Sequence, residues 1–230
     1  MPLYLPPKSA DYEDAPEGAH IGICYRVIDL GTQETTYLGQ AKKSHLILIG
    51  WELPDERMMD GRPFTVHKRY TYSSSGKSNL RKDLESWRGA KFTDEDFGVF
   101  DLGRLLGVGC MVNIVREEKG EKTYTNVQTI MRLPKGTVAG KPSNPTLCLS
   151  LDDRPFDWTG YETLTERLRQ MIAQSPEFQA AKNGIDPHQE PPPVNGESDY
   201  GVGADDLDSI PFATLSMSVE PGLNRKPVIL

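Results

Sequence analysis

Eight Lys or Arg side chains lie between Arg62 and Lys91, against two acidic ones, so this stretch carries a charge of +6 in a protein of net charge −7. Tyr70, Tyr72 and Trp87 lie among these cations. Single-stranded nucleic acid requires both kinds of side chain, because its phosphates attract cations and its bases stack on aromatic rings. The stretch is therefore a candidate surface for single-stranded nucleic acid.

Three elements must position these side chains. The pattern predicts a strand over 64–72, a Ser/Gly loop over 73–77 and a helix over 78–87. In that helix Leu80, Leu84 and Trp87 would form one apolar stripe, with Arg81 and Glu85 as an exposed ion pair one turn apart.

A second interpretation of the strand stays open. Phe64, Val66, Tyr70 and Tyr72 could instead form the core face of a half-buried strand whose charges are simply solvated. The loop favours binding, because Gly76, Lys77 and Ser78 precede a helix whose free amide groups attract phosphate. The candidate nucleic-acid-binding residues are Trp51, Lys68, Arg69, Tyr70, Tyr72, Lys77, Arg81, Lys82, Arg88, Lys122 and Tyr124.

The segments of the chain differ in the sign of their charge. Residues 20–141 carry nineteen Lys or Arg against fifteen Asp or Glu, a balance of +4, whereas residues 182–230 carry three against eight, a balance of −5. The body is thus mildly basic, although the whole chain is acidic, and the net charge does not exclude a nucleic-acid partner.

The body reads as mainly β. Extended runs over 20–30 and 34–52, the second broken near Gly39, precede the basic strand, and 46–49 is apolar on both faces. After 92–100 and a Gly-rich helical or turn segment over 102–109, a hairpin is predicted from 110–116 and 122–132. Its expected facing residues are Val112, Ile114, Val127 and Thr129. Five strands with one inserted helix suit an OB-like five-stranded barrel, a fold that binds oligonucleotides.

Four regions are expected along the chain: an N-terminal arm (1–19), the OB-like nucleic-acid-binding domain (20–150), a helical extension (151–181) and a disordered acidic tail (182–230). Within the extension, 146–151 could add a short strand and 159–175 reads as one helix, capped by Thr159 and Glu162 and ended by Pro176. That helix could pack on the barrel or on a second copy of the chain. The tail is too polar to bury a core.

The tail contains an acidic segment that runs into apolar residues, DDLDSIPF. It resembles the acidic tip of bacterial single-stranded DNA-binding proteins, although in that family the Phe ends the chain and here eighteen residues follow it. The partner-binding residues implied by this resemblance are Asp205, Asp206, Asp208, Ile210, Pro211 and Phe212.

The body supports a related resemblance. The runs SNLRKDLESWRG (78–89) and KFTDEDFGVFDLGRLLGVGCMVNIV (91–115), in the order barrel, linker, helix and acidic tail, look like the single-stranded DNA-binding proteins of tailed bacteriophages. The resemblance covers about residues 20–175. It implies a protein that coats single-stranded DNA during phage DNA replication or recombination, in the host cytoplasm, while its tail recruits replisome proteins such as a polymerase, helicase or primase.

Two other classes of function were weighed. Gly76, Lys77 and Ser78 follow a strand and precede a helix, as in a nucleotide-binding P-loop, but Thr71 stands where that motif needs Gly. The four His show no ligand spacing, so neither a metal nor another cofactor is predicted. A protein adaptor without DNA binding is the main alternative.

No signal peptide and no membrane-spanning run are evident, and Cys24, Cys110 and Cys148 read as reduced core residues.

Overall fold

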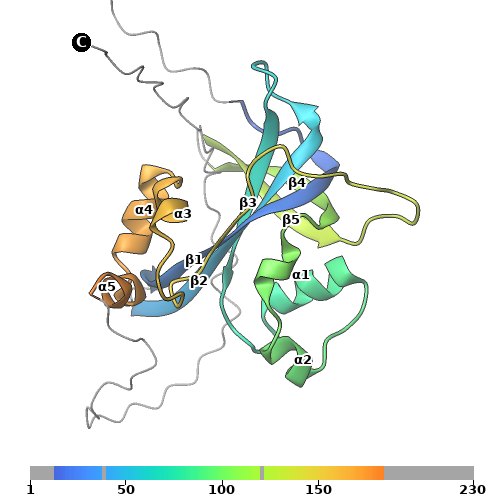
Figure 1. Ribbon diagram of the computed structural model, residues 1–230. Helices are drawn as coiled ribbons and strands as arrows, with labels where there is room; N and C mark the ends of the chain where they lie inside the picture. Colours follow the sequence, from blue (N-terminus) through green and yellow to red (C-terminus); the bar gives the residue numbers. More distant parts are fainter. Residues whose placement is uncertain (1–12, 38–39, 120–121, 184–230) are drawn as a thin grey trace, which may run out of the picture.

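The chain folds around one twisted β-sheet (Figure 1). The computed structural model describes residues 13–37, 40–119 and 122–183. Its strands are β1 (Gly18–Tyr37), β2 (Gln40–Arg57), β3 (Pro63–Thr71), β4 (Gly109–Lys119), β5 (Lys122–Met131) and β6 (Leu147–Leu149). They are ordered β3-β2-β1-β4-β5 with antiparallel pairing, and β6 joins β1 in parallel. The prediction of a mainly β protein is confirmed.

The sheet has β3 and β5 at its edges, because no ladder among the described residues pairs β3 with β5. The sheet is therefore open in its hydrogen bonding. Helix α1 (Asn79–Arg88) follows β3 and contacts both edge strands. Its place between β3 and β4 is where the single inserted helix was expected.

The first strand is longer than the predicted run over 20–30. The ladder between β1 and β2 continues to Tyr37 and Gln40, with a register shift between Asp29 and Gly31. Gly31 has φ 68° there, and its amide donates to the Asp29 carboxylate at 2.8 Å. This bulge lets the strand bend and continue. The break predicted near Gly39 is the connection from β1 to β2, which lies outside the described residues.

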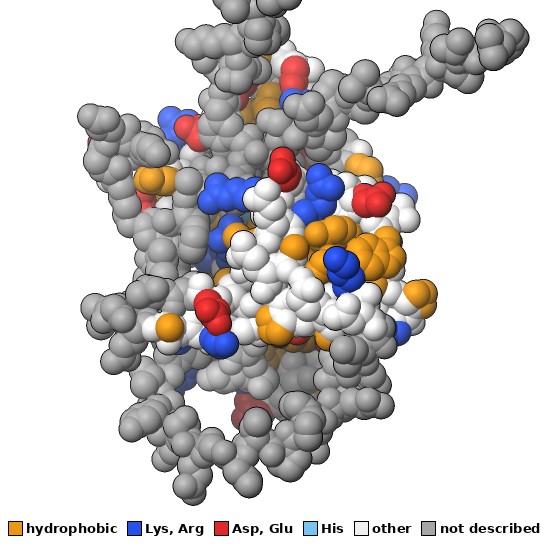
Figure 2. All heavy atoms as spheres, turned by 90° about the vertical axis from the view of Figure 1, so that its left-hand side faces the viewer, with side chains coloured by type: hydrophobic (Ala, Val, Ile, Leu, Met, Phe, Trp, Pro, Cys, Tyr) orange, Lys and Arg blue, Asp and Glu red, His pale blue; other side chains and the backbone are white. Residues whose placement is uncertain are grey.

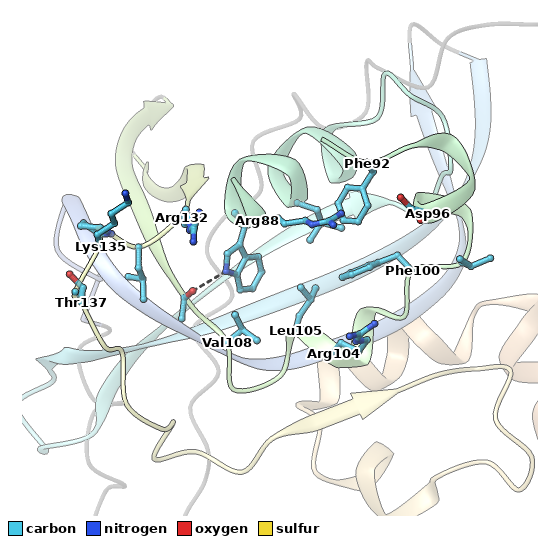
Figure 3. Close-up of a pocket in the computed structure, with 17 residues that line it drawn as sticks. Arg88, Phe92, Asp96, Phe100, Arg104, Leu105, Val108, Arg132, Lys135 and Thr137 are labelled. Atoms are coloured by element: carbon cyan, nitrogen blue, oxygen red, sulfur yellow. Dashed lines mark hydrogen bonds between the residues drawn. The ribbon is translucent and has the colours of Figure 1, made fainter. Parts of the chain in front are cut away.

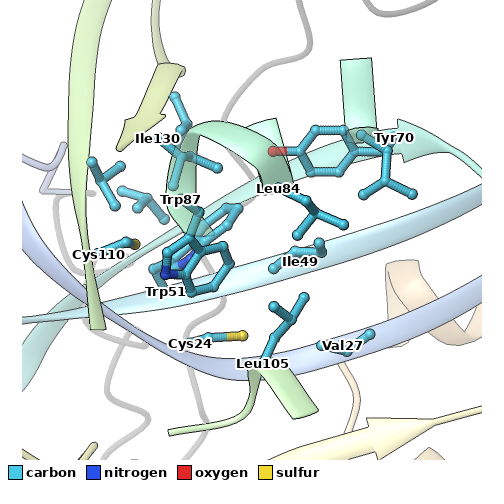
Figure 4. Packing of buried hydrophobic residues seen from close by; sticks show 14 of the residues in the cluster. Cys24, Val27, Ile49, Trp51, Tyr70, Leu84, Trp87, Leu105, Cys110 and Ile130 are labelled. Atoms are coloured by element: carbon cyan, nitrogen blue, oxygen red, sulfur yellow. The ribbon is translucent and has the colours of Figure 1, made fainter. Parts of the chain in front are cut away.

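The second strand is buried on both faces, as predicted for 46–49. On one face Ile47, Ile49 and Trp51 pack with α1 and the other strands, and Figure 4 shows this cluster closing around Trp87. On the other face Leu46 and Leu48 pack against the C-terminal helices. Figure 1 shows those helices on one side of the sheet and α1 on the other.

Helix α1 forms as the sequence predicts. Ser78 caps it by accepting a hydrogen bond from the Arg81 amide, and Gly89 ends it in the left-handed conformation. Leu80, Leu84 and Trp87 form its buried stripe. Short helices α2 (Asp94–Gly98) and η1 (Leu102–Leu105) then lead into β4, as predicted for the Gly-rich segment.

The predicted β4–β5 hairpin is present, and two of the four residues expected to face each other do so. Ile114 faces Val127, whereas Val112 faces Ile130 and Thr129 faces Asn113. A register shift between Asn113 and Ile114 causes the difference.

The prediction of one helix over 159–175 is wrong in detail, since the structure has α3 (Trp158–Glu162), α4 (Glu166–Ala173) and α5 (Pro176–Lys182). Asp157 rather than Thr159 caps the first of these helices, and Thr165 is extended and starts a new one. Pro176 begins α5 at its first turn, where a proline lacks no needed hydrogen bond. This extension packs on β1 and β2 of the same chain.

Candidate nucleic-acid interface

A cavity of about 930 Å³ opens beside the C-terminal end of α1 (Figure 3). Its walls come from the end of α1, from α2 and η1, from the start of β4 and from the chain after β5. Segments far apart in the sequence therefore meet there. We call this cavity the main hollow.

The rim of the main hollow is cationic. Arg88, Arg104, Arg132 and Lys135 line it, against the single carboxylate of Asp96. All four cationic side chains are exposed, and none of them forms an ion pair within the part of the chain that the structure describes. An anionic ligand would thus meet four positive charges that form no ion pair with any carboxylate of the described residues.

The interior of the main hollow is apolar and aromatic. Leu105, Val108 and Phe100 point into it in Figure 3. The Arg88 guanidinium lies 4.7 Å from the centre of the Phe92 ring, whose own neighbour is Phe100 at 5.2 Å, edge to face. This stack fixes the position of the Arg88 charge without neutralising it.

Trp87 closes the back of the main hollow. Its indole Nε1 donates to the Gly109 carbonyl at 2.9 Å and joins α1 to the start of β4. Its ring is buried against Trp51 at 6.0 Å. The wall behind the exposed cations is therefore part of the core.

A second hollow of about 280 Å³ lies next to the first, because Phe100 lines both. Tyr72 lines this second hollow and is 53% exposed, with its ring tilted on His45 at 5.2 Å. The two hollows together define the candidate site, which we call the groove. It runs from Tyr72 past Phe100 to Lys135.

A buried carboxylate holds the cationic segment after β5 in place. Glu52 on β2 is fully buried and accepts hydrogen bonds from the Ser143 amide and the Asn144 amide, both at 2.8 Å, and from the Asn144 side chain at 2.6 Å. At the other end of this segment, the Arg132 amide donates to the Ser86 carbonyl on α1 at 3.1 Å. The linker is thus anchored at both ends.

The structure brings two of the sequence-predicted residues into the groove, Arg88 and Tyr72. Trp51 and Tyr70 lie elsewhere. Both rings are fully buried in the core, so no base could stack on them in this fold. The core interpretation of the strand is right for Tyr70 and wrong for Tyr72, which is 53% exposed.

Several cations of the basic stretch are neutralised. The Asp83 carboxylate accepts from Lys68 Nζ and from the Tyr70 hydroxyl, both at 2.8 Å. The Arg81 guanidinium is buried, not exposed as predicted, and pairs with Glu85 and Asp94. These side chains hold α1 to its neighbours, so we do not place Lys68 or Arg81 in the site.

Arg69 lies on the face of β3 opposite to Lys68 and Tyr70, on the side of the sheet where α4 lies. Burial, followed by the charge of Arg167, lowers its pKa. Burial lowers the pKa of the neighbouring His67 to about 3, with help from Arg26 and Arg69. Figure 2 shows that Lys and Arg side chains also lie beside apolar ones on the face that carries α3, α4 and α5.

Three of the remaining predicted residues do not line either hollow. Lys77 and Lys82 are exposed near the start of α1, and Tyr124 is partly exposed on β5. The Lys122 side chain lies outside what the structure describes, as does the whole acidic segment 205–212.

Four groove residues escaped the sequence analysis: Phe100, Arg104, Arg132 and Lys135. Arg104 lies in the short helix η1 and the other three in turns or linkers, and the position of each is fixed only by the fold. The one available signal was that Arg132 and Lys135 flank a Leu-Pro pair directly after a strand. Cys148, expected in the core, is instead exposed, whereas Cys24 and Cys110 are buried.

Comparison with protein-family models and with curated proteins found no match for this sequence. Across the described ranges, no group of three or more His, Cys, Asp or Glu side chains is placed to hold a metal ion. Within those same ranges no helix is both long and apolar enough to cross a membrane.

Proposed function

We propose that this protein binds single-stranded DNA without strong sequence preference, and that the groove is its binding surface. The observation that carries the proposal is the set of four cations that form no ion pair among the described residues and surround an aromatic, apolar hollow, in a protein whose net charge is −7. Cations attract the phosphates of any sequence, and apolar or aromatic surface accepts the face of any base. Both attractions are largely independent of sequence.

The strand order supports an OB-like barrel as the scaffold. Joining the two edges of the order β3-β2-β1-β4-β5 would close a five-stranded barrel with its helix between β3 and β4. Lys68 already bridges those edges, since its Nζ donates to the Asp83 carboxylate on α1 and to the Gln128 carbonyl on β5, at 3.1 Å for the latter. On this interpretation α1 covers the seam of the barrel.

From the resemblance to phage proteins we further propose that the protein coats single-stranded DNA during phage replication or recombination in the host cytoplasm. The acidic segment Asp205–Phe212 would then recruit replisome proteins. The opposite charges of residues 20–141 (+4) and residues 182–230 (−5) favour this division of roles, with a basic body for DNA and an acidic tail for proteins.

Fluorescence anisotropy with the full chain tests the proposal. A labelled single-stranded oligonucleotide and a duplex of the same length are each titrated at several salt concentrations. We expect tighter binding of the single strand and an affinity that falls steeply as salt rises. Equal affinity for the duplex contradicts single-strand binding, and no binding of either at low salt leaves the protein adaptor as the function.

A further inference from the structure

The main hollow is larger and more apolar than phosphate contacts alone require. Phosphate binding needs only cations on an accessible surface. Here the cations form a rim, and the apolar side chains of Phe100, Leu105 and Val108 point into the interior (Figure 3). Val108 is 43% exposed and Val99, on the α2 side of the same hollow, is 84% exposed. Exposed apolar side chains that line one cavity indicate a ligand with an apolar face.

We infer that the main hollow takes up one unpaired nucleobase, held against Phe100 and Val108, while Arg104, Arg132 and Lys135 bind the phosphates on either side of it. The inference rests on the proposed function and deepens it, because it assigns a base site. Charge complementarity supports this ligand, since a nucleotide combines an apolar ring face with flanking negative charge and the hollow combines the opposite features.

The geometry also explains why a duplex would bind less well. A base inside a duplex is stacked and paired, and extracting it costs free energy. A base in a single strand can enter a hollow at little cost. The main hollow would therefore select for single strands even though the cations on its rim attract any nucleic acid.

The test compares a thymidine oligonucleotide with a strand of the same length and charge that consists of abasic deoxyribose phosphates. Both are titrated with the full-length protein at one low salt concentration. One base in the hollow should make the thymidine strand bind roughly tenfold more tightly than the abasic strand. Equal affinity for the two strands overturns the base site but leaves salt-dependent DNA binding intact, whereas failure of both strands to bind refutes the proposed function itself.

Variants place this base preference in the main hollow. Val108→Asp and Val99→Asp each place a charged group in the apolar lining of the hollow, and Met59→Asp, at a position 93% exposed on the loop after β2, is the matched control for the change of charge. We expect the ratio of the two affinities to fall towards one in both hollow variants and to stay unchanged in Met59→Asp. Two hollow variants are used so that a folding defect in one, seen by thermal melting, does not end the test. A full base preference in folded hollow variants would place the base elsewhere and overturn the inference.

Discussion

Replacing two rim cations should flatten the salt dependence of DNA binding by a calculable amount. The double variant Arg132→Ala, Lys135→Ala removes two of the four cations that line the main hollow. For single strands the slope of log affinity against log salt is about 0.7 for each neutralised phosphate. Four contacts predict a slope of about −2.8 and two contacts about −1.4, so a fourfold rise in salt should weaken wild-type binding about 50-fold and that of the variant only about sevenfold.

Anisotropy titrations at four or more salt concentrations would give both slopes. The matched control is Lys141→Ala, Lys182→Ala, which removes the same charge from exposed positions outside the groove. The control should keep the wild-type slope. If the control flattens the slope as much as the rim variant does, the effect follows from overall charge and the groove is not the phosphate-binding surface.

Three further predictions concern stability and the tail. Glu52→Ala leaves three partly buried donors without their acceptor and should lower the free energy of unfolding by about 3 kcal/mol, measured by urea denaturation. His45 Nε2 lies 2.6 Å from the Asp29 carboxylate. Burial alone would lower the pKa of His45, but the charges of Asp29, Glu177 and Asp152 outweigh burial, so the pKa of His45 is raised. The ion pair between charged His45 and Asp29 therefore stabilises the fold fully below the ordinary histidine pKa. This stabilisation is lost as pH rises through the raised pKa of His45. The melting temperature of wild type should fall more than that of His45→Asn between about pH 6 and pH 8. Deleting residues 184–230 removes acids that can compete for the rim cations, so DNA affinity should rise at low salt and change little at high salt, where such contacts are screened.

The parts of the fold that follow from local pattern were predictable. Helix α1 has a Ser cap, an apolar stripe and a terminal Gly within twelve residues, and all three signals act over a few positions. The break between α3 and α4 was not predictable in the same way, because the apolar residues keep helical spacing across it. Only the extended conformation of Thr165 interrupts the helix.

The groove was harder to predict than the fold, because it depends on contacts between distant segments. The sequence shows Arg132 and Lys135 in a Pro/Gly linker with no sign of their neighbours. They reach the groove because Glu52, about eighty residues earlier, anchors the far end of that linker. No local pattern links these positions.

Charge in the sequence also differs from charge available on the surface. The basic stretch from Arg62 to Lys91 has a formal charge of +6, but Lys68 and Arg81 meet carboxylates and serve to fix α1. Arg88 meets no carboxylate among the described residues and instead stacks on Phe92. The three cations differ because Asp83 and Glu85 on α1 and Asp94 at the start of α2 lie beside Lys68 and Arg81, whereas Arg88 lies at the end of α1 where the main hollow opens. Under the proposed function, a cation is available to DNA where no carboxylate of the described residues pairs with it, and the rim of the main hollow brings four such cations together.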